Sequence, residues 1–177
     1  MIETFRKLLF SRQLNFGKGS IRIFNKPLVM HPVEFLASFQ MYLEEKLGYE
    51  KSKKLLIEGF KRGGASFTES YVKGYGVKHK QDIIKWSMDL MTMAGWGEYE
   101  LINLDMKNSK FIFRIKNSPF TELIKSKKPV DHIIVGLIGG VAEYLLFNKP
   151  MVLKEIKCQA KGDPFCEIIG KPQKTKK

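Results

Sequence analysis

The two cysteines of this 177-residue chain lie in one short stretch, and that stretch most constrains the fold. Residues 153–168 read LKEIKCQAKGDPFCEI, in which a Gly-Asp-Pro turn signal separates Cys158 from Cys166. Residues 151–158 predict one strand, with Val152, Ile156 and Cys158 on one face, and residues 165–169 predict a second. A hairpin centred on Gly162 would place Cys158 opposite Cys166 and Ile156 opposite Ile168.

Opposed residues in such a hairpin have Cβ atoms about 4.5–5.5 Å apart. This distance permits a disulfide, two thiolates on one metal ion, or two idle thiols. The chain shows no secretory signal, and its longest apolar stretch, residues 133–142, is shorter than the ~18 residues that a membrane span needs. We therefore expect a cytoplasmic protein, whose reducing compartment argues against the disulfide except in hyperthermophiles.

The net charge of +13 comes from 31 Lys and Arg against 18 Asp and Glu, and only five of the cations are arginine. Nucleic-acid readers favour arginine for its planar fork, so a solvated basic surface is the favoured interpretation. A face for nucleic acid, for an acidic partner or for an anionic membrane remains open. The Lys-rich, Glu-rich composition is also typical of a heat-adapted or archaeal protein.

With 44% hydrophobic residues, the chain is long enough for one domain with its own core. Its periodicity predicts an α+β fold, an antiparallel sheet with packed helices that ends in the cysteine hairpin. Helices are expected over residues 32–47, 50–75, 80–94, 119–126 and 130–147, and strands over 19–24, 95–105, 110–118, 151–158 and 165–169. Residues 1–18 are expected to form a helix or arm, 19–170 the domain, and 171–177 a disordered basic tail.

Two predicted helices carry interior glycines, at positions 59, 63 and 64 and at 136, 139 and 140. Glycine is costly inside a helix, so these positions indicate either close packing or space for a ligand. The second alternative predicts an apolar pocket between the aromatic strands and the glycine-bearing helices. Its candidate lining residues are Trp96, Phe111, Phe113, Gly136 and Leu153.

Motifs for catalysis fail on their context. No Gly-Lys-Ser/Thr follows Gly63-Gly64, and the GWG of residues 95–97 precedes a strand instead of opening a helix. Three scattered histidines do not indicate a hydrolase. We therefore expect no catalytic residues.

The cysteine hairpin completes the pattern Glu-x-x-Cys-x-x-x-Gly-Asp-x-x-Cys-x-Ile, which runs from Glu155 to Ile168. This pattern, together with GWGEYEL and NSPF upstream, resembles the 4-vinyl reductase domain family over about residues 20–170. The resemblance implies a ligand-binding module similar to the sensory domains of phenol- and xylene-responsive activators.

In those sensory members the resemblance implies a structural zinc ion held by three cysteines and one glutamate. Glu155, Cys158 and Cys166 match three of these positions, and the fourth falls at His132, with neighbouring Asp131 less favoured. Histidine is an acceptable zinc ligand. In a regular strand residues 155 and 158 face opposite sides, so a bulge or strong twist must turn one of them.

These observations predict a non-catalytic sensor or carrier with an apolar pocket, a structural zinc site, an apolar small-molecule ligand and a homodimeric state. One alternative is a basic scaffold that binds nucleic acid or an acidic partner. A second is a reductase-type enzyme, for which the sequence offers no flavin or nicotinamide site.

Overall fold

The computed structural model describes residues 13–75 and 79–173, and these form an α+β domain. Its elements, in chain order, are β1 (Leu14–Gly17), β2 (Ser20–Ile23), β3 (Lys26–Leu28), α2 (Glu34–Leu47), α3 (Tyr49–Tyr75), α4 (Lys80–Met93), β4 (Glu98–Asp105), β5 (Lys110–Lys116), α5 (Pro119–Leu123), α6 (His132–Val141), β6 (Met151–Lys157) and β7 (Cys166–Pro172). A π-helical segment, Ala142–Phe147, continues α6. None of the helices in these two ranges has the length and hydropathy that a membrane crossing requires.

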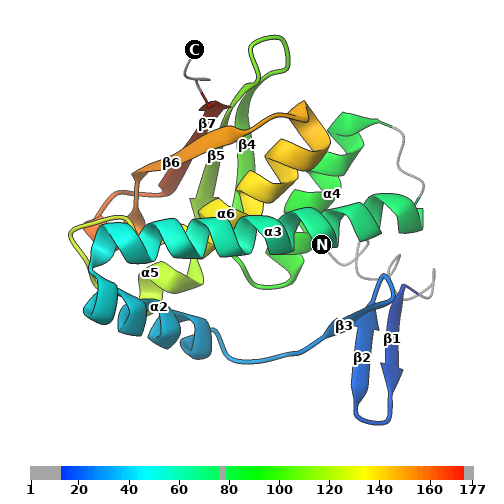
Figure 1. Cartoon of the computed structure of the whole chain (residues 1–177), viewed down its shortest axis with the longest axis horizontal. Coiled ribbons are helices and arrows are strands. Elements are labelled where there is room, and N and C mark those ends of the chain that lie inside the picture. The colour runs from blue at the N-terminus through cyan, green and yellow to red at the C-terminus, as the bar shows by residue number, and fades with distance from the viewer. Residues whose placement is uncertain (1–12, 76–78, 174–177) are drawn as a thin grey trace.

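The main sheet has the strand order β4-β5-β7-β6, and all its neighbours are antiparallel. Helix α6 lies against this sheet, and the long helix α3 crosses in front of α6 (Figure 1). A second, three-stranded meander, β1-β2-β3, lies beyond the opposite end of α3 from α2. The predicted antiparallel α+β architecture is thus confirmed.

The predicted helices all occur, with ends shifted by a few residues, because each carries a long apolar stripe. The short strands β1 and β3 are not found by the sequence pattern. β3 has three residues and contains Pro27, which cannot donate to a sheet ladder. The predicted helix or arm at the N-terminus lies mostly in residues 1–12, outside the described residues. β7 continues through Lys171 and Pro172.

Helix α6 is the centre of the core. Most of its residues are buried, and Ile133 and Ile134 are wholly inaccessible. On the sheet it faces Ile115 and Ile168, which are also fully buried. Because α6 lies between the sheet and α3, it buries apolar surface on two sides, and this explains why it is the most apolar helix in the chain.

Glycines let α3 and α6 approach each other closely. A Cβ at Gly136 would lie 2.7 Å from the Ile57 carbonyl oxygen, and one at Gly64 would lie 2.7 Å from the Leu137 carbonyl oxygen. At Gly140 a Cβ would overlap the backbone of Lys61. Of the two alternatives, these glycines therefore serve backbone packing between the helices.

Two neighbouring glycines on α3 test this packing. Gly64→Ala should lower the free energy of unfolding by about 1–3 kcal/mol, because its methyl group meets backbone atoms of α6. Gly63→Ala meets no atom within 4 Å and should raise stability by up to about 1 kcal/mol through helix propensity. Urea denaturation of both variants measures the difference. Equal effects at the two positions would contradict the close contact.

Candidate functional site

A β-bulge in β6 brings Glu155 and Cys158 to one side of the sheet. Glu155 pairs with Ile168 and Lys157 pairs with Glu167, so the register shifts at Ile156. Up to Glu155 the buried residues alternate, and after the bulge the next buried residue is Cys158. The bulge required by the sequence pattern is therefore present. The predicted pairing of Ile156 with Ile168 and the predicted face of Val152 and Ile156 are wrong, because both side chains are exposed.

The turn after β6 is fixed by its own hydrogen bonds. Asp163 Oδ2 accepts the backbone N–H of Cys158 at 2.8 Å, and Gly162 has a φ of 95°, as its predicted turn role requires. The backbone N–H of Gln159 donates to Cys166 Sγ at 3.3 Å. These bonds hold both sulfur atoms close to the turn, at the start of β7.

The segment before α6 is anchored to three other parts of the chain. Tyr49 Oη donates to the Pro129 carbonyl and Gln40 Nε2 to the Val130 carbonyl, each at 2.9 Å. The Ser118 hydroxyl donates to Asp131 Oδ1. The backbone N–H of Asp131 in turn donates to Glu155 Oε2 at 3.0 Å. Asp131 is thereby held over the cysteine hairpin.

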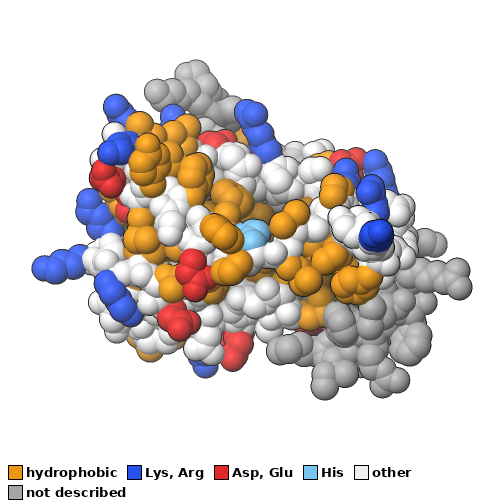
Figure 2. Space-filling view, turned by 90° about the horizontal axis from the view of Figure 1, so that it is seen from below, with side chains coloured by type: hydrophobic (Ala, Val, Ile, Leu, Met, Phe, Trp, Pro, Cys, Tyr) orange, Lys and Arg blue, Asp and Glu red, His pale blue; other side chains and the backbone are white. Residues whose placement is uncertain are grey.

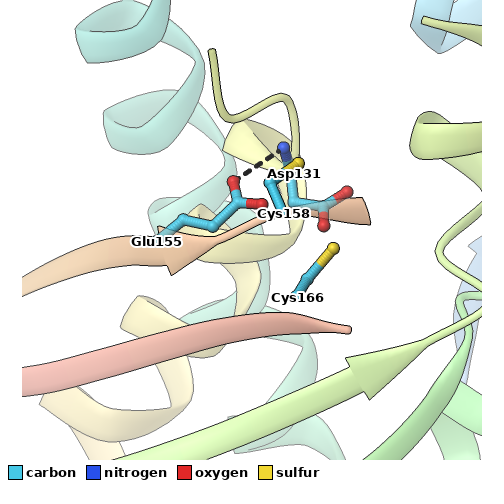
Figure 3. A group of neighbouring side chains, drawn as sticks. All are labelled: Asp131, Glu155, Cys158 and Cys166. Carbon is cyan, nitrogen blue, oxygen red and sulfur yellow. Dashed lines mark hydrogen bonds between the residues drawn. The ribbon is translucent and has the colours of Figure 1, made fainter. Parts of the chain in front are cut away.

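Figure 3 shows how these side chains converge: Glu155 and Cys158 come from β6 and its end, Cys166 from β7, and Asp131 from the segment before α6. One ligand atom from each lies within 4.8 Å of the others, and all four residues are buried. Asp131 Oδ2 and Glu155 Oε1 have no hydrogen-bond partner. Two sulfurs and two partnerless oxygens fit a tetrahedral zinc shell, after a contraction to the ~3.3–3.8 Å spacing that metal–ligand distances of about 2.0–2.3 Å impose.

The pKa values of the group reflect its burial. Burial raises the pKa of Glu155 to about 11, and nearby Asp131 and Cys158 add to the rise. Burial also raises the pKa of Asp131. The hydrogen bond with Cys166 lowers the pKa of Cys158 to about 6, while the same bond and burial raise the pKa of Cys166. At neutral pH the group thus holds protons that a bound cation would displace.

Three of the four predicted metal ligands, Glu155, Cys158 and Cys166, are brought together, and His132 does not join them. His132 Nε2 lies 3.7 Å from Glu44 Oε1, and its ring packs edge-on against Tyr49. Burial and then Lys53 lower the pKa of His132 to about 4. Asp131, the less favoured neighbour, occupies the fourth place, because it ends the anchored segment while His132 begins the helix.

A second feature is a cavity of about 110 Å³ beside this group. It lies between α3, α4, α6 with its π-helical extension, and the strands β4 and β5. Its lining residues are Gly64, Phe67, Thr68, Ile84, Trp86, Ser87, Met88, Leu90, Met91, Tyr99, Phe113, Leu137, Ile138, Val141, Ala142 and Leu146. The lining is almost wholly apolar.

Of the five predicted lining residues, Phe113 borders this cavity. Trp96 packs on Phe120, and Phe111 stacks on Phe147. Gly136 lies in the α3–α6 contact, and Leu153 packs into the core. Sequence reasoning missed the contribution of α4 and Tyr99, although Phe67 and Met91 lie in the apolar stripes of their helices.

Comparisons with known families support the fold and the hairpin. A family model described as "Activator of aromatic catabolism" matches residues 6–107, and the model of the vinyl-4-reductase domain matches residues 111–172. The first match covers more than half of the chain, and the chain belongs to this family of activators of aromatic catabolism. Its C-terminal part, which contains the cysteine hairpin, is a vinyl-4-reductase domain.

Solved structures share the fold at low sequence identity. The phenol-responsive sensory domain of the transcription activator PoxR, solved with phenol, aligns with a TM-score of 0.82 at 20% identity, over 97% of this chain and 90% of that one. A vinyl-4-reductase family protein from Methanocaldococcus jannaschii gives 0.60 at 17% identity, over 98% and 92%. Subunit 3 of a trafficking protein particle complex from Naegleria fowleri, covalently bound to palmitic acid, gives 0.59 at 17% identity, over 80% and 95%.

Two uncharacterized proteins of Methanocaldococcus jannaschii are similar in sequence. One is 38% identical over 55 residues, which are 31% of this chain and 30% of the relative. The other is 26% identical over 141 residues, which are 72% of this chain and 61% of the relative. The chain thus spans less than two thirds of the length of either relative.

Proposed function

We propose that the chain is a sensor domain that binds a small apolar ring compound in the cavity between α3, α4, α6 and the sheet. The observation that carries this proposal is the cavity's almost wholly apolar lining. An apolar cavity of about 150 Å³ stays dry and binds benzene, so one of 110 Å³ is on the scale of a single ring. The fold shared with the phenol-responsive domain of PoxR supports the same ligand class.

The cavity lies among elements that could transmit its occupancy. Ser87 and Met88 come from α4, whereas Phe113 belongs to the strand next to the cysteine hairpin, and Leu137 lies on α6. A ligand that contacts all of them would order α4 against the core. A sensor domain works by such a differential contact between its free and bound states.

We expect phenol, toluene or both to bind the wild-type protein. Ser87→Leu should reduce binding at least about tenfold, because the larger side chain fills the cavity that Ser87 lines. Ser66→Leu, the same change on the exposed side of α3, is the matched control and should leave binding unchanged. Calorimetric titration measures both. Wild-type protein that binds neither compound at millimolar concentration would contradict the proposed function.

We further propose that Asp131, Glu155, Cys158 and Cys166 hold one zinc ion. The set of two sulfurs and two carboxylates would fill a tetrahedral shell, and such a closed shell makes the metal structural. It would tie β6 and β7 to the start of α6, next to the cavity. The two partnerless carboxylate oxygens support this assignment, because buried polar atoms in folded proteins rarely lack partners.

Two neighbouring substitutions separate the observed cluster from the predicted histidine ligand. Asp131→Asn should weaken zinc binding at least about tenfold, whereas His132→Asn should leave the metal content near one zinc per chain. Zinc affinity should also increase as pH rises, because the raised pKa values of Glu155 and Cys166 mean that zinc must displace their protons. Elemental analysis and competition with a chelator measure both effects. Zinc lost from the His132 variant alone would restore the histidine prediction.

We propose that two chains pair through α2 and α3. Phe35, Phe39 and Tyr42 form an exposed apolar stripe on α2, and Leu55 is exposed on α3 beside it. Figure 2 views the side on which α2 lies, where apolar side chains gather. Three glutamates on α2 and three lysines at the start of α3 would face each other across a two-fold axis. Such a pairing is self-complementary in its apolar surface and in its charge.

Sedimentation of two exposed-phenylalanine variants tests the pairing. Phe39→Ser should shift the protein from dimer to monomer at micromolar concentration, because it removes apolar area at the centre of the stripe. Phe16→Ser changes an equally exposed phenylalanine on β1 and should leave the dimer intact. A wild-type monomer at these concentrations would contradict the proposed dimer.

A further inference from the structure

Tyr99 lies where the cavity meets the cysteine group. On the sheet it pairs with Ile115, and Ile115 pairs in turn with Cys166. Directly opposed residues point to the same face, so this row of three runs across the face that carries α6. The neighbouring row contains Phe113, which lines the cavity, as Tyr99 itself does.

The Tyr99 hydroxyl is buried and has no hydrogen-bond partner. Burial raises its pKa well above the ordinary value, and Asp131 and Cys166 raise it further. The hydroxyl therefore stays protonated and keeps both its donor and its acceptor capacity. Buried polar groups are satisfied in almost all folded proteins, so a partnerless hydroxyl on a cavity wall calls for an explanation.

The other hydroxyl groups of the cavity do not offer the same site. Thr68 Oγ1 donates to the Gly64 carbonyl at 2.6 Å and is thus used within its own helix. Almost all remaining lining atoms are apolar. An ordered water needs two to four polar partners, and an apolar wall around one hydroxyl does not supply them. A ligand that brings its own polar group into an apolar cavity matches this arrangement better than water does.

We propose that Tyr99 is the polar anchor of the cavity, which selects ring compounds that carry a hydroxyl group. The ring of such a ligand contacts the apolar wall, and its hydroxyl exchanges a hydrogen bond with Tyr99 Oη. This assignment rests on the proposed function and specifies it: an apolar cavity alone would accept any ring of the right size, whereas Tyr99 distinguishes phenol from toluene.

Phenol and toluene differ by a hydroxyl in place of a methyl group, so their affinities for two protein variants form a double-mutant cycle. For Tyr99→Phe, the ratio of the toluene to the phenol dissociation constant should fall about tenfold relative to wild type, because the hydroxyl loses its partner. Thr68→Val, whose hydroxyl is already used by the helix, is the control and should leave the ratio unchanged. In the wild-type protein, phenol but not toluene should shift the ¹³Cζ resonance of labelled Tyr99.

The outcomes separate this proposal from the one on which it rests. An unchanged ratio in Tyr99→Phe, or a Tyr99 resonance that phenol and toluene shift equally, overturns the anchor while the cavity remains a binding site. Failure of both compounds to bind the wild type overturns the cavity's function and the anchor together. Because the ligand-free hydroxyl makes no hydrogen bond, Tyr99→Phe should melt at or above the wild-type temperature. If that variant fails to fold, the resonance measurement on the wild type decides alone.

Discussion

The bulge at Ile156 is the constraint on which the rest of the site depends. Without it, Glu155 and Cys158 would point to opposite faces of the sheet, and the hairpin would offer at most two sulfur atoms to the core. With it, one carboxylate and two sulfurs converge on the carboxylate of Asp131. The bulge is local, but its consequence is long-range, since the backbone of Asp131 donates to Glu155 and so connects the last hairpin to the start of the central helix.

This connection shares its helix with the cavity. α6 begins at the cysteine group, and residues from Leu137 onward line the cavity, as does the π-helical segment that follows. On the sheet, one row contains Tyr99 and Cys166, and the next contains Phe113. The glycines of α3 and α6 set how closely the two helices pack and thus the position of one cavity wall. A bound ligand and a bound metal would therefore act on the same rigid unit.

The sequence was most informative where a pattern was local. Helices with long apolar stripes, the turn at Gly162 and the ligand atoms of Glu155, Cys158 and Cys166 all follow from short-range spacing. Asp131 was not preferred, because its position depends on bonds from Tyr49, Gln40 and Ser118, which are distant in the chain. The cavity was only partly found for the same reason: Phe113 lines it, but α4 and Tyr99 contribute through packing that periodicity does not encode. The interior glycines were read as either packing or ligand space, and only their neighbours on the facing helix decide between the two.

X-ray absorption at the zinc edge of purified, zinc-loaded protein tests the central claim most directly, that the bulged hairpin and Asp131 form one metal-binding group. The expected spectrum contains two sulfur ligands at about 2.3 Å and two oxygen ligands at about 2.0–2.2 Å, without imidazole scattering. An imidazole signal would assign the fourth position to His132 and contradict the cluster. Protein that takes up no zinc and contains a Cys158–Cys166 disulfide would contradict the metal-binding account as a whole.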